Sequence, residues 1–179
     1  MSNEVILWSM FIVPWLTLLF MPKEDIKRWM PAALFTMVVN TIILDIGFTL
    51  QMWEIRETVF PFHDQLPMAY GGLPIATMWI LKFTYRRFWL YALVELILSC
   101  VFAYIVQPWM SSRGIWVAIN VTSLKILFIA IPHFISIYLY QMWQESIFAH
   151  STEKKSFSPS LQPAATKPLP KDKKDKDDE

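Results

Sequence analysis

The chain has 179 residues, of which 55% are hydrophobic and 17% are charged, against roughly 45–50% and 25% in soluble domains. Nine of the charged side chains form an unbroken run at residues 171–179, and residues 31–112 hold only nine more. Too few charges remain to cover a soluble fold of this size, so the composition predicts an integral membrane protein. The net charge of +1 excludes a chain-wide basic surface for nucleic acid.

Motifs of catalysis, metal binding and cofactor binding are absent from the sequence. The single cysteine, Cys100, lies in an apolar run and excludes a disulfide within the chain. The three histidines show no metal-ligand spacing, and no glycine-rich phosphate loop or nucleophile motif occurs; these histidines are His63, His133 and His150. We therefore expect no catalytic, cofactor-binding or metal-binding residues, and a protein that is not an enzyme.

Five apolar stretches are candidates for membrane-spanning helices, each of which needs about 20 mostly apolar residues. Pro14 interrupts the first, and the third contains two glycines and Pro74. The runs are continuous and do not alternate, which favours helices over a β-barrel. The sequence predicts an all-α, polytopic membrane helix bundle with five transmembrane helices within residues 1–149, at residues 5–21, 31–50, 67–81, 88–106 and 121–143.

The distribution of Lys and Arg predicts the orientation, because cytoplasmic connections retain positive charge. The connections after the first and third stretches, together with the C-terminal tail, carry 13 of these residues. The connections after the second and fourth stretches carry only two, Arg56 and Arg113. We therefore expect the N-terminus outside the cell and the C-terminus inside.

From about residue 150 the sequence changes to Pro, Ser, Lys and Asp without a hydrophobic period. Such a segment cannot bury enough apolar area to offset the entropy of ordering it. Residues 150–179 are predicted to form a disordered cytoplasmic tail.

Polar side chains inside the predicted spans are costly, by roughly 2.5–3.5 kcal/mol for each charged group. At ~1.5 Å of rise per residue, Asp45 and Lys125 lie at one level of the outer half, and Glu95 and His133 lie at levels nearer the inner half. Two interpretations remain open: the groups line a polar path for protons, ions or a small solute, or they hold helices together. The intramembrane polar candidates are Asn40, Asp45, Glu95, Lys125 and His133.

The third stretch also carries a spacing typical of close helix packing. Gly72 and Ala76 are four residues apart, and small residues at this spacing allow another helix to approach closely. Pro74 between them is expected to bend the segment. We therefore predict Gly72 and Ala76 as helix-packing residues.

A set of short motifs occurs along the predicted spans and their connections. It consists of Pro22-Lys23-x-x-Ile26-Lys27-x-Trp29, Asn40 and Asp45, Leu73-Pro74-Ile75-Ala76-Thr77, and Val94-Glu95-Leu96. This pattern resembles a family of small, uncharacterised multi-span membrane proteins of Gram-positive spore-forming bacteria. The likeness covers roughly residues 7–143 and leaves the tail outside. It implies a helical bundle in the bacterial cytoplasmic membrane and supplies no catalytic residues, because that family has no assigned activity.

The preferred functional hypothesis is a non-enzymatic accessory, sensor or scaffold protein of the cell membrane, which the chain crosses several times. Its expected partners are the lipid bilayer and either a second copy of the chain or another membrane protein. The alternative is a small-solute, ion or proton-coupled transport element that uses Asp45, Glu95, Lys125 and His133. Many transporters consist of two inverted repeats with the same number of spans. Five spans cannot be divided in this way, which favours the first hypothesis over transport.

Overall fold

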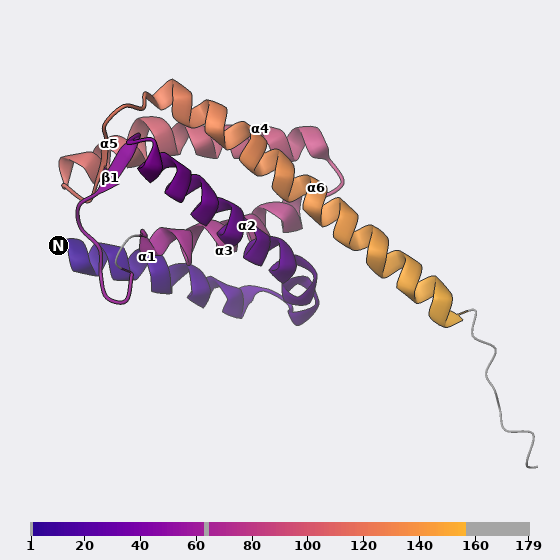
Figure 1. Cartoon of the computed structure of the whole chain (residues 1–179). Helices are drawn as coiled ribbons and strands as arrows, with labels where there is room; N and C mark the ends of the chain where they lie inside the picture. The colour runs from indigo at the N-terminus through magenta and orange to yellow at the C-terminus, as the bar shows by residue number, and fades with distance from the viewer. Residues whose placement is uncertain (1, 63–64, 157–179) are drawn as a thin grey trace, which may run out of the picture. The chain divides into compact units, whose positions relative to one another are not determined.

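The structure is a computed structural model that describes residues 2–62 and 65–156, with the backbone alone for residues 149–156. It is mostly helical, as predicted, with one short two-stranded ribbon (Figure 1). Two compact units, Met1–Gln144 and Glu145–Glu179, divide the chain, and all contacts discussed below lie within the first. The elements are α1 (Asn3–Thr17), η1 (Leu18–Phe20), α2 (Lys23–Thr49), β1 (Trp53–Ile55), η2 (Pro67–Ala69), α3 (Gly72–Thr84), α4 (Phe88–Val101), η3 (Phe102–Val106), α5 (Gln107–Ser112), β2 (Trp116–Ala118) and α6 (Ser123–Ser156).

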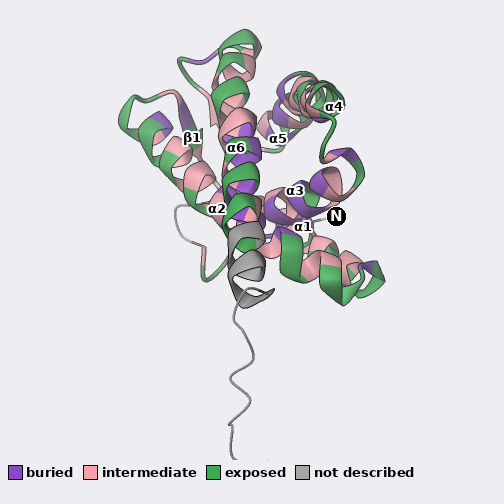
Figure 2. Ribbon diagram, turned by 90° about the vertical axis from the view of Figure 1, so that its right-hand side faces the viewer, coloured by how far each residue is buried: buried purple, intermediate pink, exposed green. Residues whose placement is uncertain are grey.

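Four helical segments within the described part of the chain are long and apolar enough to cross a membrane. Only 11–22% of the most apolar window of each is buried, and exposed or half-buried residues predominate along these helices, as the colours of the ribbon in Figure 2 show. Such a surface is suited to lipid rather than to water. The four segments are Asn3–Phe20, Lys23–Thr49, Phe88–Ser112 and Ser123–Phe148.

The third predicted stretch, residues 67–81, has a different structure from the other four. It consists of the short helix η2 and then α3, whose 13 residues extend about 20 Å, less than the ~30 Å of a bilayer core. Between β1 and η2 the described residues 56–62 and 65–66 form neither helix nor strand, and Val59 and Leu66 among them are buried. Gly71 precedes the first residue of α3, and Pro74 lies in the first turn of the helix, where a missing amide hydrogen is tolerated.

Helix α3 packs closely against α1 at Gly71, one residue before the predicted Gly72. A Cβ atom on Gly71 would lie 2.6 Å from the carbonyl oxygen of Phe11 and 2.8 Å from that of Met10. Gly72 faces the Met68 side chain, and Ala76 is exposed. The small-residue spacing therefore identified the right region of α3, but Gly71 makes the close contact and Ala76 does not.

Hydrogen bonds reinforce the contact between α1 and the α3 region. The indole of Trp15 donates to the Tyr70 carbonyl at 3.2 Å. The indole of Trp79 donates to the hydroxyl of Thr17 at 3.1 Å. Tyr70 precedes Gly71 in the chain and Trp79 follows it. The two bonds therefore hold the short helix against α1 on both sides of the close contact.

Small residues also form the interface between α2 and α3. Ala32, Ala33 and Thr36 are buried on α2, and Thr77 is buried on α3. The hydroxyl oxygens of Thr36 and Thr77 lie 3.3 Å apart and form a hydrogen bond. Such pairs let helix backbones approach closely where no hydrophobic effect drives helices together.

Helices α4 and α5 form one continuous segment with a π-helical turn, η3, between them. In this turn the Gln107 amide donates to the carbonyl of Phe102, five residues earlier. Pro108 follows directly and has no amide hydrogen to give to the preceding turn. The π-helical turn therefore lies where Pro108 would interrupt the regular α-helical hydrogen bonds.

Two connections that are distant in sequence pair as the antiparallel ribbon β1–β2, which the sequence analysis did not foresee. Trp53 lies opposite Ala118, and Ile55 lies opposite Trp116. The Trp53 ring occupies the space beside Gly47 of α2, where a Cβ atom would lie 1.8 Å from it. Asn3 completes this end of the structure, because its side chain donates to Glu57 and to the Arg113 carbonyl.

The buried side chains form two clusters. One cluster lies among α2, α3, α4 and α6 and includes Trp29, Met78 and Tyr91. The other lies beneath the ribbon and includes Leu7, Trp53, Val59, Met110 and Trp116. The described segments therefore have a separate core toward each end.

The last predicted span is longer than expected. Helix α6 begins at Ser123, close to the predicted start at residue 121, and continues to Ser156, beyond the predicted end at residue 143. Residues 150–156 of the predicted tail are thus helical. The rest of the tail prediction, residues 157–179, lies outside the described residues.

Replacing Gly71 by Ala should destabilise the protein by about 1–3 kcal/mol, because rigid backbone of α1 occupies the space that the methyl group needs. Gly72→Ala is the matched control and should cost less than about 0.5 kcal/mol, since its methyl group would approach closely only the flexible Met68 side chain and would lie at ordinary contact distance, 3.8 Å, from the Met10 carbonyl oxygen. Unfolding in mixed micelles with increasing denaturing detergent measures both. Equal stability of the two variants would contradict this assignment.

Candidate functional site

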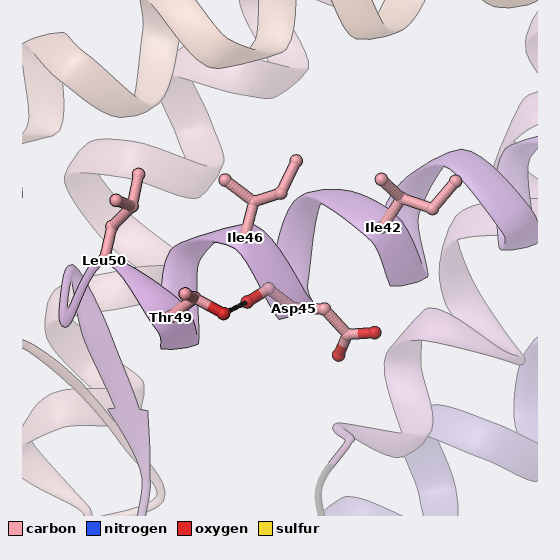
Figure 3. A pocket seen from close by; sticks show the side chains of 5 residues that line it. All are labelled: Ile42, Asp45, Ile46, Thr49 and Leu50. Carbon is pink, nitrogen blue, oxygen red and sulfur yellow. Dashed lines mark hydrogen bonds between the residues drawn. The ribbon is translucent and has the colours of Figure 1, made fainter.

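Asp45 lies on the exposed surface near the end of α2, where its carboxylate accepts a hydrogen bond from the Gln65 side chain at 3.1 Å. The neighbouring shallow hollow is an open helix face rather than an enclosed cavity, since every residue lining it is exposed. In Figure 3 the Asp45 carboxyl group points to the other side of the helix from Ile42 and Ile46. The hollow is lined by Ile42, Asp45, Ile46, Thr49 and Leu50.

Lys125 lies in the first turn of α6 and is also exposed. Its ammonium group donates to the Asn120 carbonyl at 3.5 Å. No ion pair joins Lys125 to Asp45 in the described part of the chain, although both were predicted at one level. The Gln65 amide and the Asn120 carbonyl partner these two charges instead.

Glu95 lies within the contact between α4 and α6, where its neighbour is a tyrosine. The Tyr91 hydroxyl donates to the Phe134 carbonyl of α6 at 2.9 Å. The same side chain interacts with the carboxyl group of Glu95, one helical turn further along α4. This contact links an ionisable group of α4 to the backbone of α6.

His133 is half-buried on α6, directly after Pro132 and directly before Phe134. Its Nε2 atom is buried and makes no hydrogen bond within residues 2–62 and 65–148. The histidine does not bond to Glu95 there, although the two were predicted near one level. His133 adjoins Phe134 in the chain, and the Phe134 carbonyl accepts the hydrogen bond of the tyrosine that neighbours Glu95.

Asn40 is half-buried in the middle of α2 and makes no hydrogen bond to the side chains and backbone that the structure describes. Asn40 therefore forms no hydrogen bond to another helix within the described residues. The helix contact is made one turn earlier, by Thr36.

Tyr91 is the residue of this region that sequence reasoning missed. It is completely buried and packs against Phe134 and Tyr138 of α6, with ring centroids 6.2 and 5.0 Å away. Its position four residues before Glu95 was a usable signal, because residues at this spacing share a helix face.

No group of three or more His, Cys, Asp or Glu side chains able to hold a metal ion occurs among the described residues. The polar candidates are distributed over four places: the middle of α2, the end of α2, the start of α6 and the α4–α6 contact. At the last of these the carboxyl group of Glu95 and the hydroxyl group of Tyr91 interact, and His133 directly precedes Phe134, whose carbonyl accepts the Tyr91 hydrogen bond.

No protein-family model, curated protein or solved structure matches this chain. The resemblance to uncharacterised membrane proteins of spore-forming bacteria therefore stays a prediction from the sequence.

Replacing Tyr91 by Phe should destabilise the protein by about 0.5–1.5 kcal/mol, because it removes the buried hydrogen bond to α6 and preserves the ring. Tyr104→Phe is the control: this tyrosine is 57% exposed, and we expect no measurable change. Detergent-induced unfolding compares the two variants. A Tyr91→Phe protein as stable as the control would show that this bond does not stabilise the α4–α6 contact.

Proposed function

We propose that the protein is a non-enzymatic accessory, sensor or scaffold protein that spans the bacterial cytoplasmic membrane. The observation that carries the proposal is the dispersal of the polar groups, combined with four long helices whose apolar faces are exposed. Asp45, Lys125 and Glu95 have separate neighbours and do not converge on a cavity. The lipid bilayer is the first partner, and a second copy or another membrane protein is the expected protein partner.

Five crossings, with the N-terminus outside and the C-terminus inside, agree best with the contacts. Strands β1 and β2 pair, so the chain between them must cross the membrane an even number of times. Asp25 and Lys82 form an ion pair at 3.1 Å, which requires an even number between them as well. Both conditions hold if the connection between β1 and α3, together with α3, makes the third crossing.

An irregular segment inside a membrane is tolerated only where protein covers its backbone. The burial of Val59, Leu66, Pro67 and Ala69 supports this view of the third crossing. The orientation itself follows from the basic residues: Lys23, Lys27, Arg28, Lys82, Arg86 and Arg87 all belong to the end defined by the Asp25–Lys82 pair.

Cysteine labelling in intact cells tests the orientation, in a variant whose native Cys100 is replaced by Ser. Ser112→Cys should react with a membrane-impermeant maleimide, whereas Glu24→Cys should react only after the cells are permeabilised. Both positions are exposed, and neither substitution removes a positive charge. Labelling of Glu24→Cys in intact cells would overturn the proposed topology.

The alternative function is a small-solute, ion or proton-coupled transport element that uses Asp45, Glu95, Lys125 and His133. The observation that favours it is the half-buried His133, whose Nε2 atom is buried without a partner beside the Glu95–Tyr91–Phe134 contact. Ionisable groups that follow one another across a membrane are typical of proton pathways.

Glu95→Gln and His133→Ala separate the two functions in purified protein reconstituted into liposomes. If the protein is an accessory or scaffold, neither the native chain nor the variants will dissipate an imposed pH gradient faster than empty vesicles. A flux in the native protein that falls at least tenfold in both variants, with folding retained, would favour transport. Tyr104→Phe controls for the effect of any substitution on reconstitution.

A further inference from the structure

Basic side chains from two distant segments gather at one end of the structure. The start of α2 contributes Lys23 and Lys27, and the connection between α3 and α4 contributes Arg86 and Arg87. All four are exposed. We refer to these four residues as the basic cluster.

Specific contacts bring the two segments together. The Lys82 ammonium group lies 3.1 Å from the Asp25 carboxylate. The rings of Trp29 and Tyr85 pack with centroids 5.1 Å apart, and the Arg28 guanidinium lies 4.5 and 5.3 Å from these two rings. The basic cluster is therefore held on a packed base rather than on two independent loops.

The charges of the basic cluster are not neutralised by nearby acids. None of the four forms an ion pair within the described ranges, and Asp25 is already paired with Lys82. Glu24 is the remaining acid of the α2 start, and it is exposed. The four positive charges therefore exceed the single negative charge of Glu24, and the basic cluster forms a surface that attracts anions.

The backbone at Arg86 supports a binding role. Its φ angle is +75°, in the left-handed region that costs energy for a residue other than glycine. The Arg87 amide closes this turn onto the Thr84 carbonyl at 3.0 Å. A strained turn that carries two adjacent arginines is typical of functional positions.

Large apolar side chains lie beside the basic cluster in the sequence and are strongly exposed. Phe20 is 82%, Phe83 70% and Trp89 83% exposed. Aromatic rings of this kind locate at the boundary between headgroups and acyl chains. A molecule with an anionic head and apolar tails would satisfy both the cations and the rings, whereas a dissolved anion would leave the rings in water.

We propose that the basic cluster binds the headgroup of an anionic phospholipid, with Phe83 and Trp89 against its acyl chains. The inference rests on the membrane placement proposed above and goes beyond it by naming a lipid class. Basic residues next to a membrane span attract anionic lipid, by roughly fivefold in affinity for each Lys or Arg. Recognition by four of them predicts a clear preference over zwitterionic lipid.

Native mass spectrometry of the purified full chain tests the proposal, with equal amounts of phosphatidylglycerol and phosphatidylcholine in the micelles. The native protein should retain phosphatidylglycerol in at least tenfold excess. Arg86→Gln combined with Arg87→Gln should reduce that excess by roughly 10–30-fold, and Lys23→Gln with Lys27→Gln should act similarly. Arg86→Lys with Arg87→Lys should preserve it.

Arg56→Gln with Lys125→Gln is the matched control, because it removes two positive charges away from the basic cluster. An equal loss of phosphatidylglycerol in this control, or equal retention of both lipids by the native protein, would overturn the proposal. Displacement of the lipid by millimolar inorganic phosphate would assign the cluster to a free anion and also overturn it. Stabilisation by polyglutamate without lipid preference would assign it to an acidic protein, with the same consequence.

Extraction of cell membranes with alkaline carbonate separates this inference from the proposed function. A chain that stays in the membrane but shows no lipid preference contradicts the lipid site alone. A chain that is washed off contradicts both. Each variant is measured in purified form, so a change of orientation in cells does not affect the comparison.

Discussion

In the proposed membrane placement every backbone polar group must find a partner within the chain, because hydrocarbon offers none. Helices α1, α2, α4–α5 and α6 meet this requirement by their own hydrogen bonds, and their exposed side chains are free to be apolar. The connection before α3 cannot meet it in this way. Its irregular backbone is instead covered by protein, with Val59 and Leu66 buried beneath the ribbon.

The same requirement explains how the short helix α3 is held. Small residues on α2 and Gly71 on α3 allow close backbone approach on two sides. Three hydrogen bonds, through Trp15, Trp79 and the Thr36–Thr77 pair, then fix the helix in place. In a solvent as apolar as the side chains themselves, such packing and polar contacts replace the hydrophobic effect as the source of association.

The parts of the fold that depend on hydropathy alone could be predicted from the sequence. Long apolar runs gave the four long helices to within several residues at most starts, because length and apolarity are local properties. The predicted levels of Asp45 and Lys125 gave no pair, because rise per residue fixes depth and not the direction in which a side chain points. The partner of Asp45 is Gln65. Gln65 lies in a connection without a hydrophobic period, so its position could not be predicted from the sequence.

The contact of Glu95 with Tyr91 could have been predicted, since four-residue spacing on a helix is a local property. The role of Gly71 could not, because two adjacent glycines differ only in which one faces the backbone of α1. The ribbon was equally inaccessible. Three-residue strands carry too little alternation to be distinguished from a connecting loop.

The pairing of β1 with β2 has a consequence for how the protein is made. The ribosome completes Ile55 about 60 residues before it reaches Trp116, which is several seconds at ~5–20 residues per second. During that interval the first strand has no partner strand. The ribbon therefore closes late in biogenesis, after residues 88–112 have been made, and a chain stalled before that point would leave β1 open to chaperones and proteases.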